Sequence, residues 1–449
     1  MTEQFDIVVL GTGNAGMAAA GALRAAGKSV AMIESWDVGG TCPLRGCVPK
    51  KVLVAAAQVL HQIALAPAHH IEVGAPKLDW AGLIARERGF VDGVAESFAN
   101  SLEGRGIELI RGQAKFTGPN RIVVGERVLE TGRIVIATGS KPRPLAIPGA
   151  EHLITSEDIL EMAELPARLV FIGGGVIALE FAHVFARAGT HVTILEALPR
   201  LLPRLDPDAV AQLHAESERI GIEIFTGVEV AAVAKVDDGL EVRFAHDGVE
   251  KRAVADQVAN GTGRIPNLDD LDLDAGGIDH DGLRIAVDDH LRSVSNSRVY
   301  VAGDALWSSA QLSPLASHEG RVVAENILNG DTVTPDYDTA PSAVFTVPAL
   351  AGVGLTEEAA TARGLRFAVK ANDLTAWRSS QTHAETAGYS KVLIEAETDR
   401  ILGAHILGHG AEEIVHLFAF AMKHGITARG LGDTVFAYPT FASDIKHML

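Results

Sequence analysis

The sequence predicts an α/β fold in which one strand–loop–helix–strand unit occurs twice. The chain has 449 residues, enough for about three domains of roughly 150 residues each. Its 46 glycines indicate many tight backbone turns. Two glycine-rich loops, which begin at Gly11 and Gly173, each follow an apolar run and precede a helical run. With 47% hydrophobic and 21% charged residues, the composition is typical of a globular protein and excludes disorder as the main state.

The first unit opens the chain. Residues 6–10 read as a strand, the loop that follows has glycines at Gly11, Gly13 and Gly16, and a helical run and a second strand lead to Glu34. Gly11 would make the tight turn, Gly13 would let a pyrophosphate approach the backbone, and Gly16 would let the helix pack closely on the strand. The phosphates would then face the N-terminus of the helix and its partial positive charge.

The second unit repeats this arrangement. Residues 169–172 read as a strand, Gly173 and Gly175 lie in the loop, Ala178 stands where the third glycine would be, and Glu196 ends the next strand. In both units the acid lies 23 positions after the first glycine. The repeat predicts two dinucleotide-binding domains of the Rossmann type. Two such cofactors in one chain suggest that electrons pass from one to the other.

The only two cysteines of the chain, Cys42 and Cys47, lie between the two units. A close pair in a reducing compartment is typical of redox catalysis, and two thiols alone make a poor zinc site, so we expect no bound metal. Pro49 predicts a helix that starts near Cys47, where the helix dipole and Lys50 or Lys51 would stabilise a thiolate. Lys51 lies four residues after Cys47 and would face the same way. The short spacing would let the cysteines close a small disulfide ring.

The charge balance excludes several classes of partner. Lys and Arg number 39 and Asp and Glu number 57, and the net charge of −18 argues against nucleic acid and anionic membranes. The N-terminus does not read as a signal peptide, and Gln58, His61 and Gln62 interrupt the apolar stretch 52–66, so we expect no membrane-spanning segment. A cytoplasmic protein is predicted.

The segment 39–53 resembles the signature G-G-T-C-x-N-x-G-C-V-P-x-K of the flavin-dependent pyridine nucleotide–disulfide oxidoreductases, the family of glutathione reductase, dihydrolipoamide dehydrogenase and mercuric reductase. The resemblance covers essentially the whole chain. Residues 133–140 are similar to the family's A-T-G turn at FAD, 261–267 to its G-x-G-R-x-P-N segment, 300–304 to its G-D motif, and 344–357 to the start of its dimerisation domain.

This resemblance implies two Rossmann-like domains and a C-terminal α+β dimerisation domain in a homodimer. The FAD-binding domain would be discontinuous, with residues 1–145 and 268–335, and the domain that binds NADH or NADPH would be inserted at 146–267. Residues 336–449 would form the dimer interface. Hydride would pass from the nicotinamide to FAD, electrons would pass on to a disulfide between the two cysteines, and the resulting thiols would reduce the substrate.

The resemblance also assigns roles to single residues. Glu34 would bind the adenosine ribose of FAD, and Cys47 would lie against the flavin ring while Cys42 attacks the substrate. Lys51 would lie near the flavin N5 and pair with Glu180, because a lysine there stabilises negative charge on the reduced ring. The residues predicted to bind a cofactor, besides Glu34 and Lys51, are Gly11, Gly13, Ala15, Gly16, Thr41, Ala114, Thr138, Gly139, Ser140, Gly173, Gly175, Val176, Ala178, Glu196, Gly263, Arg264, Gly303 and Asp304.

The C-terminal segment departs from the family pattern H-P-T-x-x-E. Tyr438 replaces the acid–base histidine, Ser443 replaces the glutamate that orients it, and Asp444 lies one position late. A tyrosine with an unperturbed pKa of about 10 is a poor proton shuttle at neutral pH. Its hydroxyl could donate a hydrogen bond to a leaving thiolate; the alternative is that Tyr438 only packs at the dimer interface. Leu44 stands where the family has an asparagine, and Arg45 beside it is unusual.

These departures leave the electron acceptor open. A glutathione-type or other small disulfide is favoured, although Ala22 stands where glutathione reductases have a substrate-binding arginine. Dihydrolipoamide is the second alternative, and a metal ion or a quinone is the third. The C-terminal cysteine pair of mercuric reductases is missing. A redox sensor that does not turn over is the alternative outside enzyme catalysis.

Glu196 favours NADH over NADPH, because its carboxylate would accept hydrogen bonds from a ribose diol and repel a 2′-phosphate. Arg200 or Arg204 could still bind that phosphate, and Ala178 is shared with relatives that use NADPH.

Three histidines are predicted to have no catalytic role. His61 and His383 are expected to be solvated or to cap a helix. His318 follows the G-D turn and could lie nearer the flavin, but a structural role is expected.

Overall fold

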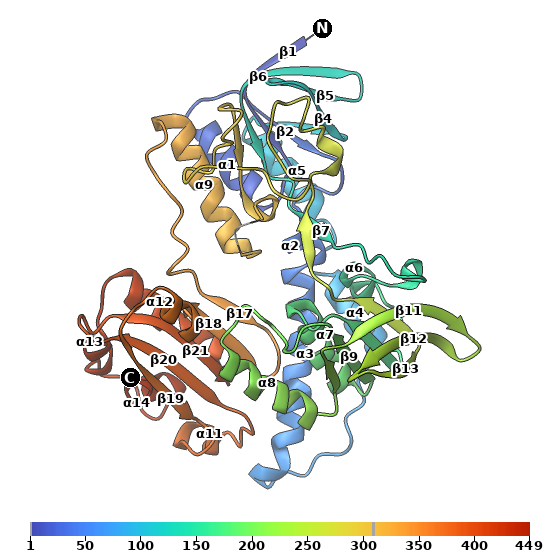
Figure 1. Ribbon diagram of the computed structural model, residues 1–449, viewed down its shortest axis with the longest axis vertical. Coiled ribbons are helices and arrows are strands. Elements are labelled where there is room, and N and C mark those ends of the chain that lie inside the picture. The colour runs from blue at the N-terminus through green and yellow to red at the C-terminus, as the bar shows by residue number, and fades with distance from the viewer. Residues whose placement is uncertain (1, 308–309) are drawn as a thin grey trace. The chain divides into compact units, whose positions relative to one another are not determined.

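The computed structural model of the protein describes residues 2–307 and 310–449. The chain folds into two compact units, each made of three segments of the sequence (Figure 1). Unit 1 consists of Met1–Pro49, Glu87–Arg143 and Arg264–Tyr337, and unit 2 consists of Lys50–Arg86, Pro144–Gly263 and Asp338–Leu449.

Unit 1 is built on a seven-stranded sheet. Its strands are β1 (Thr2–Leu10), β2 (Val30–Glu34), β3 (Glu108–Arg111), β4 (Ala114–Gly118), β5 (Arg121–Val124), β6 (Arg127–Ile136) and β16 (Val299–Val301). They lie in the order β3-β2-β1-β6-β5-β4, and β16 also pairs with β6. The pairs among β1, β2, β3, β6 and β16 are parallel, and those among β4, β5 and β6 are antiparallel. The parallel strands end together, so their following loops meet at one edge of the sheet.

Two helices lie side by side on this sheet, α1 (Asn14–Ala25) and α9 (Ser313–Asn329) (Figure 1). A Cβ atom added at Gly320 of α9 would lie 2.2 Å from the Ala15 carbonyl oxygen, so only glycine permits this approach. The other elements of unit 1 are α2 (Thr41–Arg45), α5 (Val94–Gly104) and the two-stranded ribbon of β7 (Ser140–Pro142) and β15 (Arg264–Pro266). The close packing brings the start of α9 near the start of α1.

Unit 2 contains a second parallel sheet. Its strands are β8 (Arg168–Ile172), β9 (His191–Glu196), β10 (Glu223–Thr226) and β14 (Gln257–Asn260), in the order β10-β9-β8-β14. The accompanying helices are α6 (Ser156–Leu160), α7 (Val176–Ala188) and α8 (Pro207–Arg219). An antiparallel meander of β11 (Glu229–Val236), β12 (Gly239–His246) and β13 (Val249–Ala255) shares a hydrophobic core with the sheet.

The C-terminal part of unit 2 is a five-stranded antiparallel sheet with helices. Its strands are β17 (Ser342–Val344), β18 (Ala349–Gly354), β19 (Phe367–Asp373), β20 (Tyr389–Glu395) and β21 (Ile401–Gly408), in the order β17-β18-β21-β20-β19. Its helices are α10 (Glu357–Ala362), α11 (Arg378–Thr382), α12 (Ala411–Lys423), α13 (Ala428–Gly432) and α14 (Ile445–Met448). Helix α12 packs on β18 and β21.

Helix α3 (Cys47–Leu65) begins in unit 1 and continues in unit 2, which also contains most of α4 (Trp80–Arg88). The first residue of α3 is Cys47, in agreement with the helix start that Pro49 predicts. The helical stretch Thr41–His69 is long and apolar enough to cross a membrane. We expected its polar residues to exclude a membrane span, and by length and composition they do not. Of its most apolar window, 39% is buried inside the protein, and a core helix passes the same test. Length and composition alone therefore do not assign this stretch to a membrane.

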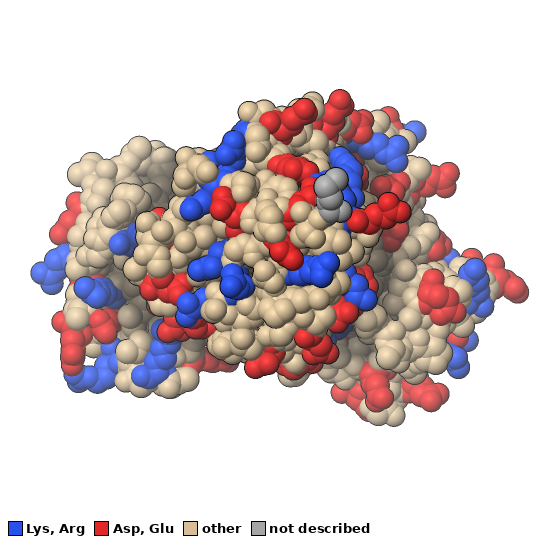
Figure 2. Space-filling model, turned by 90° about the horizontal axis from the view of Figure 1, so that it is seen from above, with Lys and Arg blue, Asp and Glu red and all other residues tan. Residues whose placement is uncertain are grey.

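The observed architecture confirms the predicted fold class, an α/β protein with two Rossmann-like domains and a C-terminal α+β domain. The bounds of the four predicted segments, 1–145, 146–267, 268–335 and 336–449, stay a prediction. On the face drawn in Figure 2, Lys and Arg side chains are interspersed with Asp and Glu side chains.

Candidate redox and dinucleotide sites

The first glycine-rich loop joins β1 to α1. Gly11 has a φ of +101°, and a Cβ atom there would lie 2.3 Å from the Ala137 carbonyl oxygen, so the tight turn requires glycine. Gly16 is required by packing, because its Cβ would lie 2.2 Å from the Gly11 carbonyl oxygen. Gly13 is different: its backbone is extended, and the nearest atom to an added Cβ is the Gly40 Cα at 3.9 Å. The protein itself does not need a glycine at position 13, and the free space beside its half-buried backbone would let a phosphate approach.

Glu34 ends β2 and is held by the same loop. Its carboxylate accepts hydrogen bonds from the backbone N–H and the hydroxyl of Thr12 (3.0 and 2.7 Å) and from the N–H of Trp36 (3.0 Å). The Thr12 hydroxyl in turn accepts the N–H of Gly39 (3.0 Å). The predicted ribose-binding acid is thus fixed beside the glycine loop, at the carboxyl end of its strand.

The turn after β6 holds an unsatisfied group. The Thr138 hydroxyl is buried and has no hydrogen-bond partner among the described residues. Gly139 next to it has a φ of +69°, with no atom within 4 Å of an added Cβ. Ser140 donates to the Asp304 carboxylate (2.8 Å) and accepts from the Arg264 guanidinium (2.9 Å). Burial raises the pKa of Asp304, although Ser140 and Arg264 oppose the shift. An orphaned hydroxyl, an open glycine and a buried carboxyl together fit a polar ligand such as FAD.

Other predicted FAD residues have varied positions in unit 1. Ala15 is buried in α1, Thr41 begins α2, and Ala114 begins β4. The Gly303 N–H donates to the buried carboxylate of Glu319 (2.6 Å). That bond fixes the turn that places Asp304.

The two cysteines are brought together by a break between two helices. Cys42 lies in α2, Cys47 begins α3, and both are free thiols. Gly46 allows the break, because its Cβ would lie 2.9 Å from the Thr41 carbonyl oxygen. The Cys47 sulfur lies 3.2 Å from the hydroxyl of Ser313, the first residue of α9. The hydrogen bond to Cys47 and burial raise the pKa of the Cys42 thiol. This arrangement favours a protonated Cys42 beside the sulfur of Cys47.

The lysines after the pair interact with α7 and with Phe345. Lys50, not Lys51, forms the ion pair with Glu180 (2.7 Å), so the predicted pairing of Lys51 is wrong. The other oxygen of Glu180 accepts the N–H of Phe345 (2.8 Å). The Lys51 ammonium lies 3.6 Å from the centroid of the Phe345 ring, and that of Lys50 lies 4.5 Å from it. Burial lowers the pKa of Lys51, against the opposing effect of Glu412.

The second glycine-rich loop joins β8 to α7 and has the same geometry. Gly173 has a φ of +103°, and its Cβ would lie 2.4 Å from the Gly261 carbonyl oxygen. Gly175 is extended, and the nearest atom to its Cβ would be that same oxygen at 3.5 Å. The Glu196 carboxylate accepts the N–H groups of Gly174 (2.5 Å) and Leu198 (2.8 Å). These residues fit the phosphates and ribose of a second dinucleotide.

Three further residues are predicted to bind the second dinucleotide. Ala178 is fully buried in α7, Val176 is 42% exposed at its start, and Gly263 has a φ of +101° with open space beside it. The two candidate phosphate ligands differ. The Arg200 guanidinium donates to the carbonyl oxygens of Leu202, Leu205 and Pro203 and lies 3.5 Å from Glu358, whereas Arg204 is exposed.

The departures at the C-terminus lie in a capped turn. Tyr438 is 71% exposed. Thr440 and Ser443 cap each other reciprocally, with the Ser443 N–H donating to the Thr440 hydroxyl (3.1 Å). The Asp444 carboxylate accepts a hydrogen bond from the Ser379 hydroxyl. Ser443 and Asp444 are therefore engaged within the C-terminal part itself.

The three histidines have defined partners. His61 is buried and lies 3.1 Å from the Glu385 carboxylate, so the prediction that it is solvated or caps a helix is wrong. His383 stacks on His409 (ring centroids 5.2 Å apart). His318 accepts the Asp336 N–H (3.1 Å), a structural contact. Sequence reasoning did not identify Ser313 or Phe345, whose contacts with the cysteine segment span long stretches of chain.

Residues 5–320 match the family described as pyridine nucleotide-disulphide oxidoreductase, and residues 340–449 match the dimerisation domain of the same family. The chain belongs to this family. It is therefore an FAD-dependent pyridine nucleotide-disulphide oxidoreductase with a redox-active disulfide, in agreement with the predicted resemblance.

Several curated members of the family are similar over nearly the whole chain. A glutathione reductase of Burkholderia cepacia is 32% identical, with 98% of this chain and 97% of the relative covered. A dihydrolipoyl dehydrogenase of Thermus scotoductus is 34% identical, covering 99% and 96%. A mercuric reductase of Bacillus cereus is 32% identical, covering 98% of this chain and 70% of the relative.

A solved structure of the HOCl-induced flavoprotein disulfide reductase RclA from Escherichia coli has a TM-score of 0.87 to this oxidoreductase, with 27% identity and 99% of both chains covered. A Cu(II) complex of an RclA mutant has a TM-score of 0.88, with 26% identity and the same coverage. Among the described residues of this oxidoreductase, no three His, Cys, Asp or Glu side chains are grouped as a metal site requires.

Proposed function

We propose that this oxidoreductase uses NADH to reduce a small disulfide through FAD and the Cys42–Cys47 pair. The observation that carries the proposal is the thiol pair itself, joined across Gly46 with the Ser313 hydroxyl 3.2 Å from Cys47. The supporting comparison is the similarity to a glutathione reductase over 98% of the chain.

Residues of both glycine-rich loops would hold the cofactors. Gly13, Glu34, Thr138 and Asp304 would bind FAD, and the loop at Gly175 would bind the nicotinamide cofactor. FAD, when bound, supplies two-electron transfer from the nicotinamide to the disulfide. Helix α3 presents the Cys47 sulfur at its N-terminus, where the helix dipole and the Ser313 hydroxyl favour a thiolate.

The chain's own sulfurs carry out the second half of the reaction. The Cys42 sulfur attacks one sulfur of the substrate disulfide, a mixed disulfide forms, and the first product leaves as a thiol with one proton. The Cys47 sulfur then attacks Cys42 and releases the second product with the second proton. One dithiol and one disulfide are thereby exchanged for one disulfide and two thiols. Because the pKa of Cys42 is raised, its proton must be taken up during this attack, and the departing thiolate of the first product accepts it. An exposed Tyr438 of a second copy is our candidate for the group that donates a hydrogen bond to that thiolate.

NADH is the proposed donor. The Glu196 carboxylate lies beside the second loop, where it would repel a 2′-phosphate. The Arg200 guanidinium, which could otherwise bind that phosphate, already donates hydrogen bonds to three carbonyl oxygens. We expect kcat/KM to be higher with NADH than with NADPH, and Glu196→Gln to narrow that ratio about tenfold. A higher kcat/KM with NADPH in the unmodified enzyme would contradict this part of the proposal.

A cytoplasmic homodimer is the proposed assembly. The family's dimerisation domain covers residues 340–449, and Phe420, Val435 and Tyr438 there are 60%, 96% and 71% exposed. Apolar side chains exposed to this degree are typical of a surface that a partner covers.

The Cys47→Ser variant tests the disulfide pathway. We expect it to lose disulfide reduction while it still passes electrons from NADH to an artificial dye, because the change removes one of the two thiols and no residue predicted to bind a cofactor. Anaerobic titration of the unmodified enzyme with NADH should produce a long-wavelength absorbance band, which a thiolate against oxidised flavin gives. Full disulfide reductase activity in Cys47→Ser would refute the assignment.

Reduction of a metal ion or a quinone is the second candidate. The observations that favour it are Tyr438 in place of the acid–base histidine and the similarity to a mercuric reductase. If Cys47→Ser keeps its turnover with quinones or metal ions, and the unmodified enzyme reduces no disulfide, this second function replaces the first.

A further inference from the structure

Three polar side chains project from the same side of α7. Glu180, His183 and Arg187 are spaced by three and four residues, the spacing that aligns side chains along one helix face. All three are buried: their side chains or whole residues are 8% exposed or less. Buried polar groups on a core helix are unusual unless each has a partner.

All three residues contact one short segment, 345–347, between β17 and β18. Glu180 accepts the N–H of Phe345 (2.8 Å), and His183 Nδ1 accepts the N–H of Val347 (3.2 Å). The Arg187 guanidinium donates to the Val347 carbonyl oxygen. This row of three side chains, the polar row of α7, therefore binds three backbone groups of the segment: the N–H groups of Phe345 and Val347 and the carbonyl oxygen of Val347.

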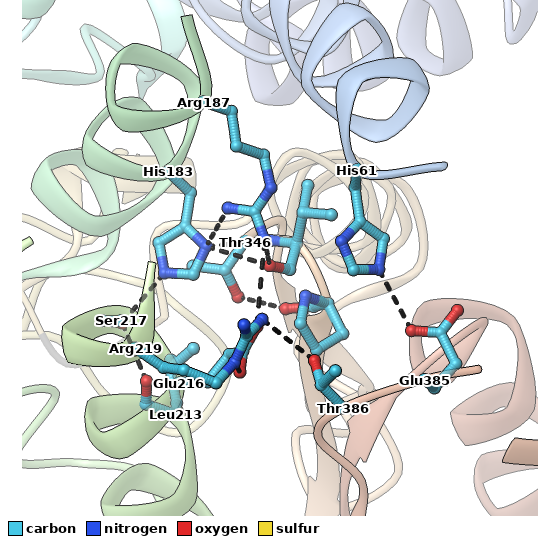
Figure 3. Close-up of polar contacts among 12 residues, drawn as sticks. His61, His183, Arg187, Leu213, Glu216, Ser217, Arg219, Thr346, Glu385 and Thr386 are labelled. Atoms are coloured by element: carbon cyan, nitrogen blue, oxygen red, sulfur yellow. Dashed lines mark hydrogen bonds and ion pairs between the residues drawn. The ribbon is translucent and has the colours of Figure 1, made fainter. Parts of the chain in front are cut away.

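The hydrogen bonds of His183 define its protonation state. The Ser217 hydroxyl donates to the Leu213 carbonyl oxygen (2.7 Å), so it accepts from His183 Nε2 (2.9 Å) (Figure 3). Nδ1 then has a free electron pair for the Val347 N–H and for Arg187 (3.3 Å). Burial and the Arg187 charge lower the pKa of His183 well below its ordinary value. Nδ1 also lies 3.1 Å from the Val347 carbonyl oxygen, but the Ser217 and Arg187 contacts and the lowered pKa favour the neutral imidazole with Nδ1 as an acceptor.

A second layer fixes Arg187. Glu216 of α8 lies 4.0 Å from Arg187 and accepts two hydrogen bonds from Arg219 (2.6 and 2.7 Å). Arg219 also donates to the Thr386 hydroxyl (3.0 Å), which ties the cluster to the C-terminal part of unit 2 (Figure 3). Each charged member of the cluster therefore has an opposite charge or an acceptor within reach.

The segment held in this way carries the ring that contacts both lysines. Phe345 places its ring centroid 3.6 Å from the Lys51 ammonium and 4.5 Å from that of Lys50. Lys50 is at the same time paired with Glu180, the first member of the row. A change in the backbone of 345–347 would therefore move both the ring and the ion pair.

We propose that His183 and Arg187 are positioning residues of the redox site: they hold the 345–347 segment so that the Phe345 ring and Glu180 keep Lys50 and Lys51 in place. Lys50 and Lys51 follow Cys47 by three and four residues on α3. The consequence for flavin reduction rests on the proposed function, whereas the placement of the lysines does not.

The test measures the lysines directly. In the holoenzyme, the rates at which a small anhydride acylates Lys50 and Lys51 are compared with that of exposed Lys370 by peptide mass spectrometry. We expect His183→Ala and Arg187→Met to raise the rates at Lys50 and Lys51 at least about threefold, the effect of losing a cation–π contact. His183→Gln keeps an acceptor and a donor and should restore most of the protection.

The matched control is Val184→Ala, which removes buried volume from the same helix without touching the polar row. It should lower thermal stability but leave the acylation rates unchanged. Phe345→Leu should reproduce the Lys51 effect, and combined with Arg187→Met it should add little, because both remove the same contact. Phe345→Leu and Arg187→Met keep most of the side-chain volume at their positions. They can therefore be used for the acylation test if His183→Ala does not fold.

The same variants are then reduced anaerobically with NADH. We expect a roughly threefold to tenfold slower flavin reduction at saturating NADH with an unchanged half-saturating concentration. If acylation in His183→Ala and Arg187→Met matches Val184→Ala, the residues are merely structural and the proposal is overturned. If neither nicotinamide reduces the unmodified enzyme, the proposed function fails, and the acylation rates still decide the positioning role.

Discussion

The first residue of each dinucleotide loop has nearly the same backbone, with φ of +101° at Gly11 and +103° at Gly173. In each loop the acid at the end of the second strand accepts an N–H from the second residue of the loop and another from two positions after itself. These acids are Glu34 and Glu196. The repeated sequence therefore produces a repeated hydrogen-bond pattern, in which the acid organises the loop as well as being placed for a ribose.

The two units differ in the turn that faces each loop. In unit 2 the Thr262 hydroxyl donates to the Asn260 side chain (2.8 Å). In unit 1 the corresponding hydroxyl of Thr138 is buried without a partner among the described residues. The Thr262 hydroxyl of unit 2 is thus satisfied by the protein, whereas the Thr138 hydroxyl of unit 1 leaves a donor for a ligand. This difference fits a cofactor that stays bound in unit 1 and one that exchanges in unit 2.

The largest expected effect is a loss of stability when the first glycine of either loop is replaced. Gly11→Ala and Gly173→Ala should each destabilise the protein by at least about 3 kcal/mol, because positive φ is combined with a clash against a carbonyl oxygen. Gly189→Ala is the matched control: its φ is +102°, but no atom lies within 4 Å of the added Cβ. Thermal unfolding should separate Gly173→Ala from Gly189→Ala. Equal losses in the two would show that strain alone, and not the close approach, determines the effect.

A smaller effect, on ligand binding, should distinguish the loop proposed to bind FAD from the loop proposed to bind NADH. Gly13→Ala and Gly175→Ala introduce no close contact within the protein, so we expect stability within about 1 kcal/mol of the unmodified enzyme. Gly13→Ala should weaken FAD binding, and Gly175→Ala should weaken NADH binding, each by roughly tenfold or more. FAD content after dialysis and the NADH dependence of flavin reduction measure the two. A variant that loses both ligands, or neither, would break the correspondence between the units.

Sequence could predict this correspondence because its signals are local. The strand–glycine–acid pattern and the cysteine pair each lie within a few tens of residues, and the structure places them together as expected. The error at Lys50 and Lys51 has a physical reason. Adjacent helix residues point about 100° apart, and only the position of Glu180, 130 residues away, decides which one forms the ion pair.

Ser313 and the polar row of α7 could not be predicted for a related reason. Ser313 contacts Cys47 across 266 residues, and His183 contacts Val347 across 164. No periodicity or motif in the sequence marks a serine at a helix start, or a histidine on an apolar helix, as part of a distant site. The tertiary packing alone brings these side chains together.

The smallest expected effect concerns the carboxylates. Glu34 and Glu196 each accept hydrogen bonds from backbone N–H groups, so Glu34→Gln or Glu196→Gln should lower stability by about 1 kcal/mol. Asp304 should behave in the opposite way. Burial raises its pKa, so ionising this carboxyl is less favourable in the folded protein than in the unfolded chain. Asp304→Asn should therefore raise the Tm of the apoprotein at pH 7 while it weakens FAD binding.

The pH dependence distinguishes this explanation from a general gain in stability. Because the pKa of Asp304 in the folded protein lies above its ordinary value, ionisation destabilises the apoprotein as pH rises from the ordinary value through the raised one, and the penalty is constant above it. The Tm advantage of Asp304→Asn should therefore vanish in acid below the ordinary pKa and grow as the pH rises through the raised one. An advantage that does not change with pH would show that the buried charge is not its cause. Asp304 would then resemble Glu34 and Glu196, whose carboxylates accept hydrogen bonds from backbone N–H groups of the protein.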